Sequence, residues 1–163
     1  MTPSLDPSFA PPGAGSCGKI LFVASKFPTY DEAFILRELY ALSKETDIAI
    51  FSIKKSRDKV IHDQASELLS RTVFVRLFSF KVIFSVIKLL VTRPLKTLGA
   101  LAELVRGNLG YSEFLAKNLV LFPKTLCLAD WALSNKITHI HGCWATYPAS
   151  MAMVVSRITG IPF

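Results

Sequence analysis

The stretch Lys19–Ile53, KILFVASKFPTYDEAFILRELYALSKETDIAIFSI, decides the fold of this chain. It opens with Lys19–Ala24, a continuous apolar run with β-branched residues, which is typical of a strand buried on both faces. Asp47–Ile53 has the same character, and an amphipathic segment separates the two runs. A strand, a helix and a strand within about 35 residues form a βαβ unit, so we predict a parallel sheet with a right-handed crossover.

The segment between the two strands holds a loop and then a helix. Pro28 disfavours helix at the residue before it, so Ser25–Tyr30 is predicted to be a loop. Asp31 is suited to cap the helix, and the carboxylate of Glu32 suits its positive N-terminal end. The apolar positions of the helix share one face and are Phe34, Ile35, Leu39 and Leu42.

The end of the chain returns to the alternation of strand and helix. We predict a strand at Ile137–His141, a turn at Gly142–Tyr147 and a helix at Pro148–Thr159. Ile161–Phe163 has the composition of the first residues of another strand. A sheet that stops within a strand is unfinished, so we expect the chain to be the front part of a longer enzyme.

Two predicted loops, Ser25–Glu32 and His141–Tyr147, follow the carboxyl ends of strands, where doubly wound sheets bind their ligands. His141 ends its strand at a point where a hydrogen-bond donor or a proton-transferring group is useful. The alternative is a histidine that packs under the following helix and bonds to the backbone. His139 is expected on the same side but deeper in the sheet, in a structural role.

Three further residues in or near these loops carry side chains that can bind a ligand. Glu32 is either a carboxylate that stabilises a helix start or an acceptor for a sugar hydroxyl, and Lys26 is placed to meet a phosphate. Cys143 lies close to His141, but no further ligands stand at the spacing of a metal site, so no metal is predicted. The three cysteines of the chain are unpatterned and predict no disulfide framework, which favours a reducing cytosol.

The N-terminal residues 1–18 are rich in proline and glycine and lack an apolar core, so they predict a disordered tail rather than a signal peptide. Within and just after this tail, Gly13–Lys19 matches two phosphate-loop patterns. Such loops work only between a preceding strand and a following helix, and here the strand comes after the loop. Ile20 also stands where a magnesium-binding Ser or Thr is needed, so we reject a nucleotide loop.

The net charge of +7 is concentrated in one segment, residues 71–106, which holds seven basic residues and one acidic residue. The same segment is strongly apolar. A basic and apolar segment favours a membrane surface over nucleic acid, because nucleic-acid readers interleave their basic residues with Gly, Asn, Ser and exposed aromatics.

A long apolar helix is predicted within this segment. From Phe80 onward, Lys81, Ser85, Lys88 and Thr92 form one narrow polar stripe. A membrane span at 73–91 is disfavoured, because three basic residues lie inside it. Two readings stay open: a helix packed over the sheet with its polar stripe in water, or a helix lying in the lipid interface with its lysines toward anionic headgroups.

The residues after the first strand resemble a known family. KILFVASKFPTYDEAFILRELYALSK is similar to the opening of family 4 retaining glycosyltransferases of the GT-B fold, particularly those of exopolysaccharide and colanic-acid-type biosynthesis. Those enzymes have a pattern like F-P-x-x-S-E-T-F-I-x-R-E after the first strand. The matching residues are Phe27, Pro28, Glu32, Phe34, Ile35, Arg37 and Glu38. Asp31 and Ala33 depart from the pattern.

A second segment, HIHGCWATYPASMAMVVSRITGIPF, is similar to the family pattern H-I-H-A-H-F/W-A-x-x-P-A-x-x-A followed by L-x-G-I-P-F. The matching residues are His139, His141, Trp144, Ala145, Pro148, Ala149, Gly160, Ile161 and Pro162. Cys143 replaces the last histidine of the pattern. The resemblance covers about Lys19 to Phe163.

The resemblance implies an α/β fold with a Rossmann-like parallel sheet and flanking helices, the incomplete N-terminal half of a GT-B fold. Residues 19–163 would be the acceptor-side domain, with a basic apolar helical insert at about 71–135. Family members transfer a sugar from a nucleotide-sugar donor to a saccharide or lipid-linked acceptor at the inner face of the cytoplasmic membrane. They need no obligatory metal or cofactor, and their C-terminal domain binds the donor, so this chain alone is expected to be inactive.

Carried onto this sequence, the resemblance implies a substrate-binding set of Lys26, Phe27, Asp31, Glu32, His141 and Trp144, with His141 as the candidate catalytic residue. Residues of about 71–106 would meet the membrane surface. The alternative function is a non-enzymatic α/β domain that docks on a membrane or a partner through its basic apolar helices.

Overall fold

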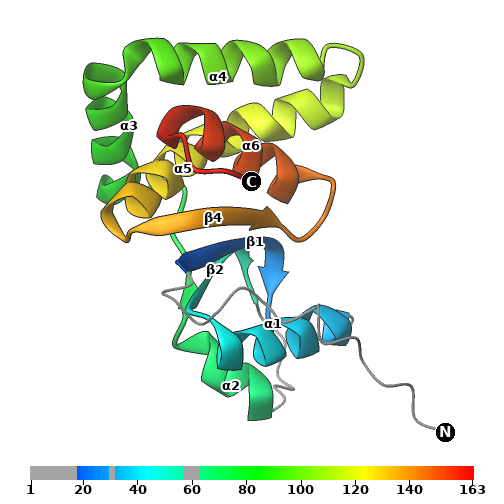
Figure 1. The fold of residues 1–163 in the computed structure, drawn as a ribbon. Coiled ribbons are helices and arrows are strands. Elements are labelled where there is room, and N and C mark those ends of the chain that lie inside the picture. The colour runs from blue at the N-terminus through cyan, green and yellow to red at the C-terminus, as the bar shows by residue number, and fades with distance from the viewer. Residues whose placement is uncertain (1–17, 30–31, 57–62) are drawn as a thin grey trace, which may run out of the picture.

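In the computed structural model, a four-stranded parallel sheet lies between helical layers (Figure 1). The structure describes residues 18–29, 32–56 and 63–163. The strands are β1 (Lys19–Phe27), β2 (Ile48–Lys55), β3 (Thr72–Val73) and β4 (Ile137–Gly142). The helices are α1 (Ala33–Glu45), α2 (Asp63–Leu69), α3 (Phe80–Thr92), α4 (Pro94–Gly107), α5 (Ser112–Ser134) and α6 (Tyr147–Thr159). This is the predicted α/β class, with a Rossmann-like sheet and flanking helices.

The sheet order is β3-β2-β1-β4, and every neighbouring pair is parallel. The predicted βαβ unit is confirmed as β1-α1-β2, and β4 lies on the other side of β1. β3 was not predicted. It contains only Thr72 and Val73, which pair with Ile50 and Phe51, and two residues are too few to produce a strand pattern in sequence.

β1 is longer than predicted, because Ser25–Phe27 continues the strand instead of forming a loop. Lys26 and Phe27 stand opposite Lys54 and Lys55 of β2. The backbone N–H of Phe27 donates to the buried hydroxyl of Ser52, at 2.9 Å, which holds this extension against β2. Asp31, the predicted cap of α1, and residues 1–17 of the predicted tail lie outside the described residues.

The end of the chain is not a strand in the structure, contrary to the prediction for Ile161–Phe163. It nevertheless runs beside β4, where the N–H of Ile140 donates to the carbonyl of Pro162 at 2.9 Å. Proline has no N–H and so cannot contribute to a ladder in the other direction. The two segments therefore share one backbone hydrogen bond rather than a regular ladder.

The sheet separates two hydrophobic cores. On one face, α1 and α2 cover β1 and β2, with Phe22, Leu39 and Ile50 at the centre. On the other face, α5 and α6 cover the sheet, with Val23, Leu128 and Val155 at the centre. Side chains of β1 and β2 are buried on both faces, which explains why these strands read as continuous apolar runs.

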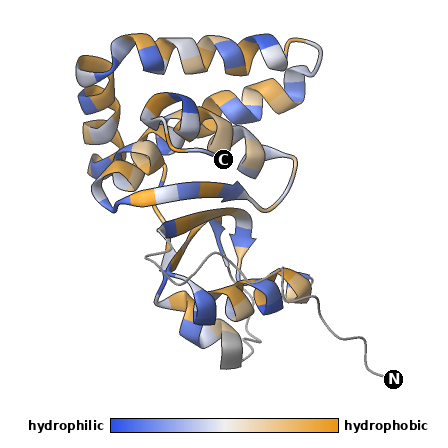
Figure 2. Ribbon diagram, in the orientation of Figure 1, coloured by the Kyte–Doolittle hydropathy of each residue, from blue (hydrophilic) through white to orange (hydrophobic). Residues whose placement is uncertain are grey.

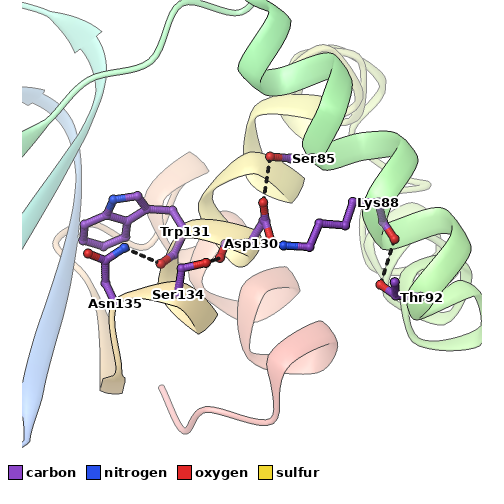
Figure 3. A network of polar contacts seen from close by, with 7 residues as sticks. All are labelled: Ser85, Lys88, Thr92, Asp130, Trp131, Ser134 and Asn135. Atoms are coloured by element: carbon purple, nitrogen blue, oxygen red, sulfur yellow. Dashed lines mark hydrogen bonds and ion pairs between the residues drawn. The ribbon is translucent and has the colours of Figure 1, made fainter.

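α3 and α4 form a further layer outside α5 and α6 (Figure 1). α3 packs on α5 through Val82, Ser85 and Leu89, and Ser85 is only 1% exposed. The reading in which α3 packs over the sheet is wrong, since α3 packs on α5. Of its polar stripe, Lys81, Lys88 and Thr92 are exposed, as that reading expected, but Ser85 turns toward α5. The reason is Asp130 of α5, which accepts hydrogen bonds from the hydroxyl of Ser85 at 3.1 Å and from the ammonium of Lys88 at 2.6 Å (Figure 3).

Many apolar side chains of this outer layer are left exposed as a consequence. Hydrophobic and hydrophilic residues interleave along α3 and α4 in Figure 2. The exposed apolar residues of α3 and its approach, which we call the α3 apolar face, are Phe78, Phe80, Ile83, Phe84, Ile87, Leu90 and Val91. Within the described residues, no helix combines the length and the hydropathy needed to cross a membrane.

Candidate functional site

The carboxyl ends of β1, β2 and β4 meet at one edge of the sheet but do not end level. The last β1–β4 pair is Val23 with Gly142, whereas β1 and β2 stay paired to Phe27 and Lys55. The chain after β4 turns sharply, and the N–H of Cys143 donates to the carbonyl of Val23 at 2.9 Å. The longer β1–β2 pair therefore forms a ledge beside the turn between β4 and α6.

Gly142 allows this turn to lie against the first residues of α6. A Cβ atom at position 142 would stand 2.9 Å from the Cα of Ala149 and 3.1 Å from the carbonyl carbon of Pro148. These are backbone atoms of a helix and cannot move aside easily. Glycine at this position thus fixes where the next residues, Cys143 and Trp144, leave the sheet.

Glu32 and Trp144, both predicted as substrate-binding residues, meet at this edge although they are far apart in the sequence. The indole N–H of Trp144 donates to the carboxylate of Glu32 at 3.1 Å. The ring of Phe34, in the first turn of α1, meets the Trp144 ring edge to face, with centroids 5.9 Å apart. Trp144 is still 40% exposed, so one part of its ring is held and the rest faces solvent.

His141 is exposed rather than packed under α6. It stands opposite Phe22, whose ring centroid is 5.3 Å from that of the imidazole, and therefore lies on the α1 side of the sheet. His139 stands opposite Ile20, on the same side as His141 and further from the carboxyl edge, as expected, and its side chain is also exposed. Both histidines are accessible because α1 and α2 pack beneath β1 and β2 (Figure 1).

The remaining members of the predicted set are less favourably placed. The side chain of Phe27 is only 5% exposed and belongs to the core under α1. Together with Pro28 and Lys55, it lines a small pocket of about 210 Å³. Lys26 is half-buried near the end of β1, and its carbonyl accepts from the hydroxyl of Thr29. Asp31 lies outside the described residues.

A larger pocket, of about 660 Å³, opens at the same edge on the opposite face of the sheet. We call it the edge pocket. It lies between the ends of β1 and β2, the N-terminal half of α5 and the start of α6. Its lining is mainly apolar and includes Ile53, Leu77, Phe114, Val120, Leu121 and Tyr147, with the rings of Phe114 and Tyr147 stacked 4.8 Å apart.

Lys124 lines the edge pocket and was not among the predicted residues. It is 3% exposed, donates to the carbonyl of Ile53, and its ammonium lies 4.5 Å from the Phe74 ring centroid and 5.4 Å from that of Phe51. Burial lowers the pKa of Lys124 to about 8. The sequence does contain a signal for this residue, because Lys124 is the single charged residue in the apolar run LVLFPKTLCLA. A lysine within such a run is rarely buried unless a partner binds its ammonium group.

Cys143 is unsuited to nucleophilic chemistry. It is half-buried against the core under α1. Burial and the nearby carboxylates of Glu38 and Glu32 raise the pKa of its thiol to about 12. The thiol therefore stays protonated at neutral pH. Across residues 18–29, 32–56 and 63–163, no group of three or more His, Cys, Asp or Glu side chains is arranged to hold a metal ion.

Comparison with known proteins gives no information about this site. No protein-family model matches this chain, and neither the curated proteins nor the solved structures include a significant match to it. On one side of the sheet edge, Trp144 is bonded to the carboxylate of Glu32, and His139 and His141 are exposed on β4. On the other side lies the edge pocket, which is apolar and lined by lysines. Such an arrangement can bind and orient a ligand.

Proposed function

We propose that this chain is the acceptor-side domain of a glycosyltransferase that uses a nucleotide-sugar donor and acts at the cytoplasmic face of a membrane. The donor would be bound mainly by another domain of the enzyme. In this proposal the acceptor sugar lies at the carboxyl edge of the sheet, over the turn between β4 and α6.

The contact between Glu32 and Trp144 is the observation that carries the proposal. The two segments that resemble the glycosyltransferase patterns are separated by about 100 residues, and this hydrogen bond joins them at 3.1 Å. They meet at the sheet edge where parallel α/β folds bind ligands. The contact thus brings one matched residue of each segment together at that edge.

The chemistry of the pair suits a saccharide. An indole ring offers a flat apolar surface for the C–H face of a sugar, and a carboxylate accepts hydrogen bonds from sugar hydroxyls. Glu32 has one oxygen bonded to Trp144 and further acceptor capacity on its carboxylate. His141 is exposed on the α1 side of the same strand end, where it is available to a bound acceptor or to a closing domain.

Nuclear magnetic resonance of the two tryptophan indole N–H groups tests acceptor binding directly. Saccharide titration is expected to shift the Trp144 signal and leave that of Trp131, which lies in α5 and packs against the core, unchanged. The variant Glu32→Gln keeps the size of the side chain but removes its charge, and should weaken the response. Nucleotide sugars alone should shift neither signal.

Sugar transfer itself is tested on the longest polypeptide that the gene encodes, with radiolabelled nucleotide sugars and membrane extracts as acceptors. Transfer that falls in Glu32→Gln and Trp144→Ala but survives in Glu45→Gln, an exposed change at the C-terminal end of α1, supports the proposal. Absence of transfer and hydrolysis with all common nucleotide sugars would refute it.

A second candidate function, a domain that docks on membranes without catalysis, is favoured by the α3 apolar face. Phe78 and Phe80 are 95% and 92% exposed, and basic residues such as Lys81 and Lys96 belong to the same segment, residues 71–106. Exposed aromatic residues beside lysines suit the interface of an anionic bilayer. Membrane docking is compatible with both functions, so sugar binding at Trp144 is what separates them.

A further inference from the structure

The edge pocket has the size and the lining of a ligand site rather than of a packing defect. Its volume of about 660 Å³ falls within the range of about 300–1,000 Å³ that small-molecule pockets occupy. One wall is the surface of α5 that carries Val120 and Leu121, and Leu77 lies opposite, before α3. Val120 is 60% exposed, an unfavourable position for an apolar side chain unless something covers it.

Lysines give this apolar pocket a positive character. Lys54, Lys117 and Lys124 all line it, and no Asp or Glu does so among the residues that the structure describes. Lys117 is paired with Glu113 one turn earlier, whereas Lys54 makes no ion pair with any described acidic residue. Lys124 is buried with one carbonyl acceptor and two aromatic rings, which leaves ammonium donors unused. An anion in the pocket would offset the cost of keeping this charge out of water.

The apolar lining continues in sequence into the α3 apolar face. Leu77 contributes to the pocket, and the next residue, Phe78, is almost fully exposed. A ligand with an apolar chain can therefore lie against Leu77 and Val120 and extend along the residues that lead to α3. A free phosphate would leave the apolar walls uncovered, and a nucleotide base would find few polar groups to bond with there.

We propose that the edge pocket binds an amphiphilic anion, namely a phosphate group carried on one long apolar chain. The phosphate lies at Lys54 and Lys124, and the chain follows Val120 and Leu77 toward the α3 apolar face. Where this anion is the carrier of the acceptor sugar, the inference rests on the proposed function. Binding of the anion itself requires no sugar transfer.

Isothermal titration calorimetry with farnesyl phosphate, below its micelle concentration, tests the site. Farnesol and inorganic phosphate are the matched probes that each lack one half of the ligand. We expect one farnesyl phosphate per chain, with affinity at least about tenfold above that of either probe, because both the charge and the chain are recognised. Val120→Asp and Lys54→Gln, both at exposed positions, should each weaken binding about tenfold.

The controls carry the same chemical changes away from the pocket. Leu109→Asp lies between α4 and α5, and Lys96→Gln lies on α4; both positions are exposed and neither lines the pocket. They should bind farnesyl phosphate as the unmodified chain does. No binding, equal binding of farnesol, or equal losses in pocket and control variants would each overturn the inference.

The outcome is separable from that of the proposed function. Site-specific binding of farnesyl phosphate by a protein whose gene product transfers no sugar would keep this inference and refute the glycosyltransferase. Sugar transfer that is unchanged by Val120→Asp and Lys54→Gln, in a chain that binds no farnesyl phosphate, would do the reverse.

Discussion

At the scale of single residues, Lys124 links the stability of the fold to pH. Its pKa is about 8 in the folded chain and has its ordinary value of about 10.5 when unfolded. Between these values the unfolded chain binds more protons, so the free energy of unfolding should rise with pH from about 8 to about 10.5. The gain approaches about 3 kcal/mol, since each pKa unit corresponds to about 1.4 kcal/mol. Urea denaturation at pH 7 and pH 10 measures it.

The variant Lys124→Met isolates this effect from the other groups that titrate at high pH. Methionine has a similar length and no charge, so its profile lacks the Lys124 contribution. The unmodified chain should therefore gain stability relative to the variant as pH increases from 7 to 10. Parallel profiles would mean that the Lys124 ammonium is not destabilised by its surroundings.

Gly142 gives a second prediction at the residue scale, because a Cβ atom there would press on the backbone of Ala149. Gly142→Ala should lower the free energy of unfolding by about 2 kcal/mol, the usual cost of overpacking. Gly99→Ala is the matched control: Gly99 lies inside α4 with nothing within 4 Å of the added methyl. It should stabilise the chain by about 0.5–1 kcal/mol. Equal effects of the two changes would contradict the close approach.

The residues of the candidate site differ in how well sequence could predict them. Glu32 and Trp144 were predicted from motif position, and they meet in the structure because both follow strands that end at the same edge. Phe27 was predicted for the same site but is buried, since β1 runs further than its apolar pattern indicates. Lys124 was missed, because sequence order does not reveal that the middle of α5 lies over the end of β2.

At the scale of elements, α3 shows that the position of a polar stripe on a helix does not reveal what the stripe faces in the fold. Periodicity placed Ser85 and Lys88 on one face but could not indicate whether water or a partner met that face. Asp130, about 40 residues later, supplies the partner (Figure 3). The mainly apolar remainder of α3 therefore faces outward. The sequence had left open whether this apolar face covers the sheet or meets a lipid interface.

The contact between α3 and α5 should depend on Asp130. Asp130→Ala removes the acceptor of Ser85, which is 1% exposed, and an unsatisfied buried hydroxyl costs about 1–3 kcal/mol. The double variant Ser85→Ala/Asp130→Ala should regain about 1 kcal/mol of the sum of the two single losses. Urea denaturation of the four proteins gives this coupling energy. The control is Thr92→Ala, which removes only an exposed hydrogen bond to the Lys88 carbonyl and should change stability by less than about 0.5 kcal/mol. If the losses of the Ser85→Ala and Asp130→Ala variants simply add in the double variant, the contact between the two residues is contradicted.

At the scale of the whole molecule, the sheet and its layers follow from the strongest patterns in the sequence. The two continuous apolar runs, β1 and β2, are buried on both faces, so their pattern alone indicated a parallel sheet covered by helices. The outer layer of α3 and α4 was not predictable in this way, because it packs on α5 and α6 rather than on the sheet and leaves many of its apolar residues exposed. The interior is therefore that of an ordinary α/β domain, whereas the side formed by α3 and α4 exposes apolar side chains that the fold does not bury.

That side should bind anionic membranes. Vesicles that contain phosphatidylserine should sediment the chain, and the bound fraction should fall only partly in high salt, because the aromatic side chains insert while the lysines contribute electrostatic attraction that salt screens. Phe78→Ser/Phe80→Ser should reduce the partition coefficient at least about tenfold at any salt concentration, since full burial of a phenylalanine contributes about 1.5–3 kcal/mol. Lys81→Gln/Lys96→Gln should weaken binding at low salt alone.

Phe163→Ser, an exposed change at the end of the chain, is the control and should bind normally. If no binding occurs at low salt, or if the phenylalanine variant binds like the control, the α3 apolar face is not a membrane surface, and its exposure must be explained by a protein partner instead.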